Sequence, residues 1–180
     1  MKYIVIFAIL ILITTTSCTS GYSTIGIGTS YFKENQDDYK TDYEPRATVN
    51  FTHIAEFKKK VAIGYSTNRP EHLISDRNTY NITLKNGIKA INQQKVTTDT
   101  LLVGKRFGRW LPMANLTNAR VDNKFIINNN VKRKINTALL YGASVTYFIN
   151  EEYSTSLAYV LGNEELGIDY GLLATISLKL

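Results

Sequence analysis

The sequence predicts an all-β protein, an antiparallel up-and-down transmembrane β-barrel with ten strands favoured and eight as the alternative count. Three observations predict this fold. Almost every apolar stretch has a period of two residues, as in a strand with one apolar and one polar face. Short connections alternate with long polar ones, which is typical of an antiparallel meander. The chain also ends inside such a strand, where one face carries Tyr170, Leu172, Ala174, Ile176, Leu178 and Leu180.

The amino-terminal residues have the pattern of an export signal. Met1 and Lys2 form a positive start, and residues 3–13 form an apolar run of eleven residues. A helix needs about 20 apolar residues to span a bilayer, so this run fits a signal peptide better. We therefore expect residues 1–18 to be a signal peptide, lipoprotein-type or ordinary secretory, and residues 19–180 to be the barrel domain.

The position of the only cysteine, Cys18, indicates lipidation. It follows Ser17 directly after the apolar run, as in a bacterial lipobox, and a lone cysteine cannot form a disulfide within the chain. We expect Cys18 to carry a lipid. The alternative is ordinary cleavage near Ser20 and Gly21, which would discard Cys18 with the leader.

The first four strands are predicted where apolar side chains alternate with small or polar ones. They span residues 21–32, 45–57, 60–67 and 80–85. Their apolar faces include Ile25 and Ile27, Val49 and Phe51, Val61 and Ile63, and Tyr80, Ile82 and Leu84. Because the opposite faces carry glycine, serine, threonine and asparagine, each strand should separate an apolar surface from a polar one.

The remaining six strands complete the count of ten. Strong alternation predicts strands at residues 100–107, 138–148, 152–160 and 170–180. Two further strands are predicted at residues 88–92 and 111–119; the second alternates poorly and contains Pro112, which cannot donate a ladder hydrogen bond. Losing or merging these two strands would give eight.

Turn residues divide the connections into two groups. Short turns are predicted at Lys58-Lys59, at Asn86-Gly87 as a type I′ hairpin, and at residues 108–110 and 150–152. Long polar loops are predicted at residues 33–44, 68–78, 92–99, 120–136 and 162–167. An alternation of this kind places the short and the long connections at opposite ends of a meander.

Glycine and aromatic residues favour a closed barrel with its apolar face outside. Glycine weakens a strand unless another group approaches closely, as inside a narrow barrel, and six glycines fall on the polar faces: Gly26, Gly28, Gly64, Gly104, Gly142 and Gly171. Two aromatic belts match the two interfaces of a membrane. They comprise Phe57, Phe107, Trp110, Tyr147, Phe148 and Tyr153 beside the short turns, and Tyr31, Tyr80, Tyr159 and Tyr170 toward the long loops. A soluble barrel with an apolar interior is the alternative fold.

With these features, residues 21–180 resemble the small outer-membrane β-barrels of Gram-negative bacteria, the opacity-type and related eight- to ten-stranded proteins. The most specific element is the final strand, because the family's assembly machinery reads a terminal strand that ends in an aromatic residue, usually Phe. Leu180 departs from that pattern. The resemblance implies an outer-membrane location with both termini periplasmic. It also implies contact with membrane lipid and lipopolysaccharide, assembly by the barrel-assembly machinery, and a monomer.

The net charge of +6 is spread along the chain, which argues against nucleic-acid binding. Lys132, Arg133 and Lys134, in the longest predicted loop, are candidates to contact phosphates of lipopolysaccharide or an acidic partner. The polar faces also carry basic residues that should line the lumen: Arg46, Lys85, Arg106 and Lys179. We therefore expect a structural or surface-exposed binding protein, with a narrow anion-preferring channel as one alternative.

Enzymatic chemistry is a weaker hypothesis. His72 lies near Glu71, Ser75 and Asp76, which are residue types of a hydrolase site, although polar loops often combine them by chance. His53 falls on an apolar face near a short turn, as expected of an interfacial histidine. The sequence predicts no catalytic residue, no metal and no cofactor. A barrel hydrolase and a soluble periplasmic ligand-binding barrel are two further functional hypotheses.

Overall fold

The structure is a computed structural model that describes residues 18–34, 39–41, 46–57, 60–68, 78–84, 87–128, 130–163, 166 and 168–180. These residues contain ten strands: β1 (Cys18–Glu34), β2 (Tyr39–Thr41), β3 (Arg46–Phe57), β4 (Val61–Asn68), β5 (Asn78–Leu84), β6 (Lys89–Lys105), β7 (Trp110–Ile127), β8 (Asn130–Phe148), β9 (Tyr153–Asn163) and β10 (Ile168–Lys179). In the described part of the chain, no helix is long and apolar enough to cross a membrane. The expected signal peptide falls on residues that are almost all outside the described ranges, and β1 already begins at Cys18.

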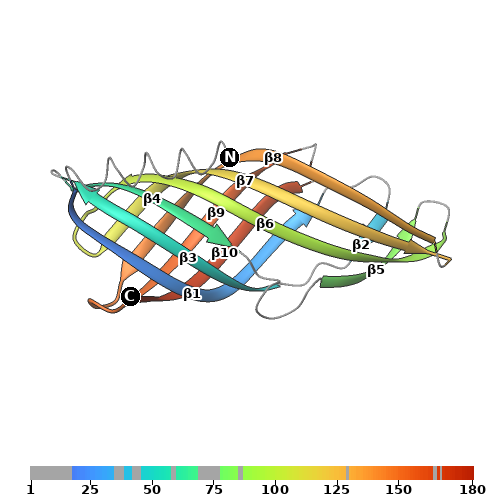
Figure 1. Cartoon of the computed structure of the whole chain (residues 1–180), viewed down its shortest axis with the longest axis horizontal. Coiled ribbons are helices and arrows are strands. Elements are labelled where there is room, and N and C mark those ends of the chain that lie inside the picture. Colours follow the sequence, from blue (N-terminus) through green and yellow to red (C-terminus); the bar gives the residue numbers. More distant parts are fainter. Residues whose placement is uncertain are drawn as a thin grey trace.

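Eight of the strands close into an antiparallel barrel (Figure 1). The ring follows the chain order β1, β3, β4, β6, β7, β8, β9, β10, and β10 returns to pair with β1. In the closing pair, Thr24 lies opposite Lys179 and Tyr31 lies opposite Leu172. The predicted up-and-down barrel is confirmed, with eight strands in the ring.

Short turns join the strands at the end of the barrel where β1 begins and β10 ends. Phe107 and Trp110 exchange backbone hydrogen bonds of 2.7 and 3.0 Å around Gly108, whose φ of 61° suits glycine. In the turn between β8 and β9, the Asn150 side-chain oxygen accepts hydrogen bonds from the backbone N–H groups of Glu152 and Tyr153. The predicted Lys58-Lys59 corner lies outside the described residues. Gly87, with φ 79°, does close a hairpin between β5 and β6, but that hairpin belongs to the opposite end.

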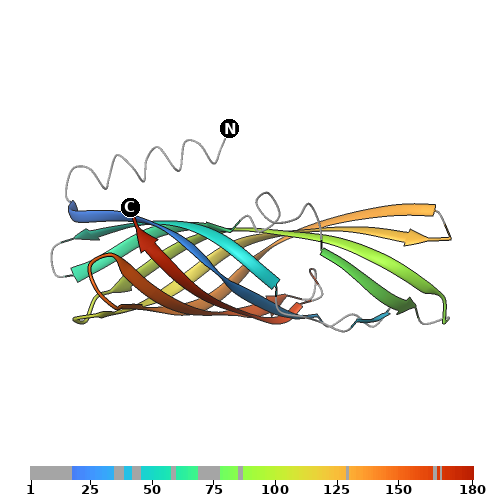
Figure 2. The same ribbon diagram turned by 90° about the horizontal axis from the view of Figure 1, so that it is seen from below.

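Three strands continue beyond the ring as a sheet. β4 ends where Asn68 lies opposite Thr98, whereas β6 runs on to Lys89 beside the long β7–β8 hairpin. We call residues 89–97, 120–127 and 130–137, together with β2 and β5, the extension. Figure 2 shows it standing beyond the barrel at the right of the view.

Two predicted loops are therefore wrong. Residues 92–99 lie within β6, where they join the predicted strands 88–92 and 100–107 into one, and residues 120–136 form the arms of the β7–β8 hairpin. The weakly alternating strand 111–119 is confirmed inside β7. The loops were predicted because both faces of these segments are largely polar. Ladder hydrogen bonds and cross-strand pairs hold such strands together once they leave the apolar band of the barrel.

The predicted barrel strand 80–85 has a different role from the one expected. β5 lies outside the ring and pairs with the end of β6. Ile82 is 2% exposed and packs with Ala90, Leu84, Phe125 and Ile127. Its apolar face therefore covers the inner side of the extension and is not part of the outer surface of the barrel.

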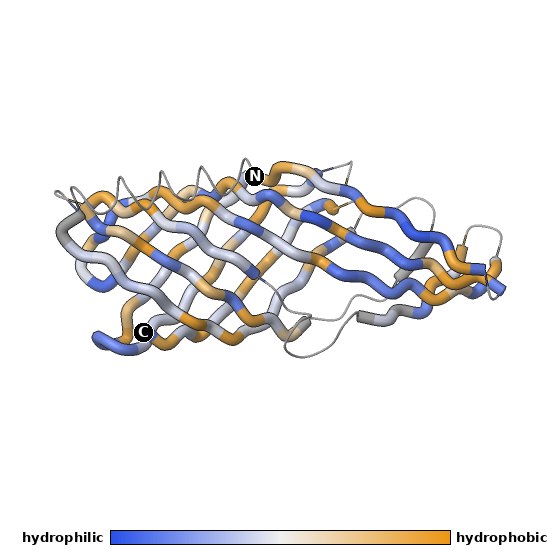
Figure 3. The backbone as a smooth tube through the Cα atoms, viewed as in Figure 1, coloured by the Kyte–Doolittle hydropathy of each residue, from blue (hydrophilic) through white to orange (hydrophobic). Residues whose placement is uncertain are grey.

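Apolar and polar residues alternate along the barrel strands (Figure 3), and their exposure places the apolar side chains outside and the polar ones largely inside, as predicted. Ile27 and Ile176 are 68% and 60% exposed, whereas Thr175 and Ser177 are each 4% exposed. Gly28 shows why glycine occurs on the inner face. A Cβ atom there would lie 2.0 Å from the Ala174 carbonyl oxygen, so no larger residue fits between the closing strands.

Phe148 was wrongly predicted in the outer aromatic belt. It is buried inside the barrel, where its ring meets the Tyr22 ring edge-on with 5.7 Å between centroids. Parity explains the error, because Phe148 follows the outward-facing Tyr147 and so points inward at the last turn of its strand. Its size fills the narrow short-turn end of the lumen.

Candidate functional site

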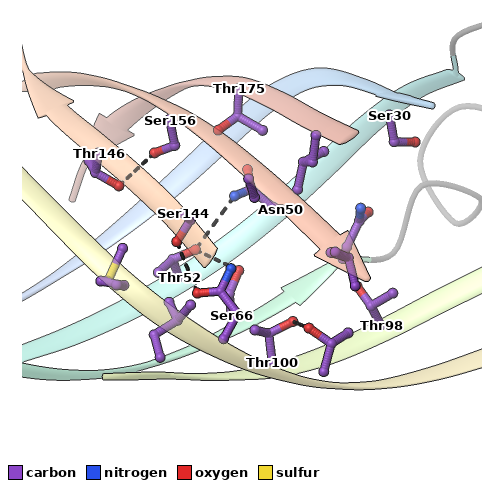
Figure 4. A pocket seen from close by; sticks show the side chains of 18 of the residues that line it. Ser30, Asn50, Thr52, Ser66, Thr98, Thr100, Ser144, Thr146, Ser156 and Thr175 are labelled. Carbon is purple, nitrogen blue, oxygen red and sulfur yellow. Dashed lines mark hydrogen bonds between the residues drawn. The ribbon is translucent and has the colours of Figure 1, made fainter. Parts of the chain in front are cut away.

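A cavity of about 100 Å³ lies inside the barrel, and all eight strands of the ring contribute to its wall (Figure 4). Hydroxyl groups bridge neighbouring strands across this wall in three pairs: Thr52 with Ser66 at 2.8 Å, Thr100 with Thr117 at 3.0 Å, and Thr146 with Ser156 at 2.8 Å. None of the described residues that line the cavity is charged. A polar cavity of this size has room for a few water molecules.

Apolar layers close the cavity on both sides. At the short-turn end the layer consists of Tyr22, Ile54, Ala62, Leu102, Leu111, Met113 and Phe148. Toward the extension it consists of Val96, Ala119, Val121, Ala138, Leu140, Leu166 and Ile168. Leu166 comes from the β9–β10 connection and is 2% exposed, so this connection helps to close the lumen. The described side chains pack the lumen on both sides of the cavity, as expected for a barrel of eight strands.

The basic residues predicted to line the lumen do not form a continuous path. Arg106 lies at the short-turn end, where its Nη1 is 2.8 Å from Glu56 Oε1 and its guanidinium stacks 4.0 Å from the Phe148 ring centre. The Lys179 ammonium lies 5.3 Å from the Tyr22 ring centre at the same end. Lys85 and the Arg46 side chain lie outside the described part. The described lining of the cavity is uncharged and lies between two apolar layers. This arrangement does not favour the anion-channel alternative.

The extension is strongly basic. Its β6, β7 and β8 segments, residues 89–97, 120–127 and 130–137, contain seven Lys or Arg and a single acidic residue, Asp122. The outer face holds Lys95, Arg120, Lys124 and Arg133 around Asp122, as the strand registers show. Arg120 and Arg133 are exposed, and Lys95 and Lys124 are half-buried. We call these four residues the basic face.

Asp122 is held by one member of the basic face. Arg133 Nε and Nη2 donate to its two carboxylate oxygens at 2.9 and 2.5 Å. These hydrogen bonds raise the pKa of Arg133 above its ordinary value, so the group stays cationic at any physiological pH. The remaining three cations of the basic face project around this neutralised pair.

Lys132, Arg133 and Lys134 were predicted as one cluster, but the strand separates them. Lys132 lies opposite Phe125 and Lys134 opposite Asn123, on the inner side of the extension, while Arg133 lies on the outer face. Sequence reasoning missed Lys95, Arg120 and Lys124 because they fall in segments predicted as loops. Continued period-two spacing through residues 120–124 was the signal that could have found them.

The residues suggested for hydrolysis do not assemble into a described site. His72 lies outside the described ranges. His53 Nδ1 is 3.0 Å from Ser23 Oγ on the outer surface, and the described residues supply no carboxylate to orient this histidine. Within the described residues, no three His, Cys, Asp or Glu side chains gather as potential metal ligands. The side chain of Cys18 is not described, and its lipidation stays a prediction.

Comparisons with known proteins identify the fold. No protein-family model and no curated protein matches the chain. A crystal structure of Ail, the attachment invasion locus protein of Yersinia pestis, superposes with a TM-score of 0.59 at 19% identity over 88% of this chain and 94% of Ail. A second Ail structure, in complex with the heparin analogue sucrose octasulfate, gives 0.55 at 16% identity over 89% and 97%. The chain has the fold of the small outer-membrane β-barrels, which confirms the predicted resemblance at the level of fold.

Proposed function

We propose that the protein is an outer-membrane barrel that displays the extension at the cell surface, where its basic face binds phosphate or sulfate groups of polysaccharides. The charge of the extension is the observation that carries this proposal, since its three main segments hold seven basic residues and one acidic residue. The function is binding through a rigid sheet, with the barrel as its anchor.

The exterior of the barrel supports a membrane location. Backbone groups in hydrocarbon need partners within the protein, and a closed ring of strands supplies them. Apolar side chains such as Ile27, Leu157 and Ile176 are more than half exposed on the outer face, as a lipid-facing band requires. With this orientation the short turns and both strand ends, at Cys18 and Leu180, face the periplasm, and the extension faces outward.

The spacing of the basic face supports a repeating anion as the ligand. Neighbouring strands lie about 4.8 Å apart, and alternate residues of one strand about 7 Å apart. Lys124 lies opposite Arg133, and Lys95 lies opposite Asp122, so cations from three neighbouring strands surround this carboxylate. Arg and Lys bind phosphate and sulfate oxygens through charge-assisted hydrogen bonds. Ail, which shares the fold, was crystallised with the sulfated heparin analogue sucrose octasulfate.

Lipidation of Cys18 would add a second attachment. β1 begins at Cys18, and its backbone lies opposite Phe57 at the short-turn end of the barrel. Acyl groups on this residue would therefore enter the periplasmic leaflet directly beside the strand. One acyl chain alone anchors weakly, whereas a barrel plus acyl chains gives two independent attachments. The intact mass of the mature protein distinguishes an acylated Cys18 from unmodified protein cut near Ser20.

The binding proposal is tested with a triple variant in which Lys95, Arg120 and Lys124 are each changed to Gln. The matched control changes Lys60, Lys105 and Arg109 to Gln, three exposed cations at the opposite end. We expect the first variant to lose about tenfold in affinity for both heparin and lipopolysaccharide-derived phosphosaccharide, on the scale of three surface charge interactions. Separate measurements with the two ligands show which anion the sheet prefers. Equal losses in the two variants would contradict the proposal.

A further inference from the structure

The far end of the extension carries a partly exposed apolar row that the basic face does not explain. Ile91, Ile126 and Val131 lie opposite one another on β6, β7 and β8, all on the outer face. Val131 is 57% exposed and Ile91 38%. The neighbouring β5–β6 hairpin adds Ile88, which is also exposed. We call Ile91, Ile126 and Val131 the apolar row; Figure 3 shows apolar colour returning at the far end of the otherwise polar extension.

Cations stand directly behind this row. The next register on the same face holds Lys124 and Arg133, and the one after it holds Lys95, Asp122 and Ile135. Each step of two residues along a strand advances about 7 Å. Moving inward from the end of the extension, the outer face presents the exposed Lys89, then the apolar row, and then a register with two cations; in the next register Asp122 offsets Lys95.

The apolar row cannot belong to the lipid-facing band of its own barrel. Leu139, an exposed apolar residue of that band, lies eight residues from Val131 along β8, or about 26 Å in an extended strand, and one exposed apolar residue, Ile135, lies between them. Arg120, Lys124 and Arg133 lie between the two levels. A single bilayer would have to bury these cations in order to reach both apolar regions, at a large cost in free energy.

We infer that the end of the extension inserts shallowly into a second, opposing bilayer that contains anionic phospholipid. The order of side chains matches the order of layers in such a surface. Apolar residues enter the acyl boundary, while Lys and Arg one or two steps behind meet the negative headgroups. The charge complementarity selects an anionic surface, because Asp122 is the one acidic residue of these segments. The inference shares with the proposed function the premise that the extension faces outward.

The test uses the full-length protein in nanodiscs of phosphatidylcholine, mixed with separate vesicles and followed by co-flotation. We expect co-flotation with vesicles that contain phosphatidylserine and none with vesicles of phosphatidylcholine alone. The variant Ile126→Thr/Val131→Thr keeps β-branched side chains but removes apolar surface, and we expect about a tenfold loss in vesicle affinity. The matched control is Val61→Thr/Ile149→Thr, which changes two exposed β-branched residues at the short-turn end and should bind as the unchanged protein does.

A spectroscopic probe reports insertion directly. Trp110 is the only tryptophan, so Trp110→Phe with Val131→Trp places a single indole in the apolar row. Its emission should shift to the blue with phosphatidylserine vesicles and stay unchanged with phosphatidylcholine. Three results would each overturn the inference: equal binding to neutral and anionic vesicles, unchanged affinity of the Ile126→Thr/Val131→Thr variant, or nanodiscs that pair with one another through this row without binding vesicles.

Polysaccharide binding separates the two proposals. The Ile126→Thr/Val131→Thr variant should keep its affinity for heparin, because the basic face is intact. Vesicle binding without any heparin binding would overturn the polysaccharide proposal alone. Heparin binding with no vesicle binding would overturn the bilayer inference alone.

Discussion

Arg106, directly after β6, and Glu56 on β3 form an ion pair of 2.8 Å that spans the intervening strand β4 at the short-turn end of the lumen. Glu56 is largely buried, and Arg106 also donates to the Gly108 carbonyl oxygen and stacks on Phe148. Arg106 therefore links Glu56 on β3 to the turn at Gly108 and to the Phe148 ring, and together these groups fill the short-turn end of the lumen.

A double-mutant cycle measures the coupling free energy between Arg106 and Glu56. Arg106→Met leaves the Glu56 carboxylate without this partner in a largely buried position, and we expect it to lower the free energy of unfolding by about 1–3 kcal/mol. Adding Glu56→Gln should restore part of that loss, because the buried charge is gone. Urea titration of the heat-modifiable folded form gives both values. If the double variant loses the full sum of the two single losses, the residues are not coupled.

Asp122 limits the charge of the basic face. Asp122→Asn removes one negative charge and releases Arg133 from its two hydrogen bonds. We expect a two- to fivefold gain in heparin affinity at low salt, on the order of one surface charge interaction, and a smaller gain at high salt because exposed charges are screened. Salt-gradient elution from heparin resin measures it. Earlier elution than the unchanged protein would contradict the assigned role of Asp122.

Gly28 is required where the barrel closes. Gly28→Ala would place a Cβ atom 2.0 Å from the Ala174 carbonyl oxygen across the β1–β10 pair, and the backbone has no room to yield. We expect a loss of about 1–3 kcal/mol in unfolding free energy. Thr29→Ala, at the adjacent outward-facing position, is the control and should change little. Equal stability of both variants in urea would show that the closing strands are looser than their register requires.

The packed lumen predicts the absence of a pore. Two apolar layers enclose the hydroxyl-lined cavity, and the described lining residues are uncharged. We expect no steady conductance from the folded protein in planar bilayers with molar chloride salts. A stable, anion-selective current would instead support the narrow channel and require the layer around Leu166 to open.

Sequence reasoning succeeded where a strand borders two different environments. Ile176 and Thr175 could be assigned to opposite faces because the outside of the barrel is apolar and the inside polar, so one residue's polarity reveals its direction. The same contrast in polarity assigned Gly28 to the inner face, and turn residues predicted the turn around Gly108. It failed at Phe148, because the ends of the lumen are filled by apolar side chains that polarity alone assigns to the outside.

The extension could not be predicted for a related reason. Residues 92–99 and 120–136 carry polar side chains at most positions of both faces, with apolar ones on both faces as well, so the contrast between faces that marks the barrel strands is weak. Their stability comes from pairing with distant segments, which one sequence does not reveal. The basic face was missed with them, because Lys95, Arg120 and Lys124 become neighbours only when β6 and β7 align.

The central claim is that the protein forms a closed barrel in the outer membrane. Its most direct test is to fractionate cells that express the full chain and to compare the gel mobility of unheated and boiled protein. A closed barrel in the outer membrane should appear in the outer-membrane fraction, and unheated protein in mild detergent should migrate differently from boiled protein, because every strand of the ring is hydrogen-bonded on both sides. Recovery of the protein in the soluble periplasmic fraction, with one mobility before and after boiling, would contradict the membrane barrel and favour a soluble one.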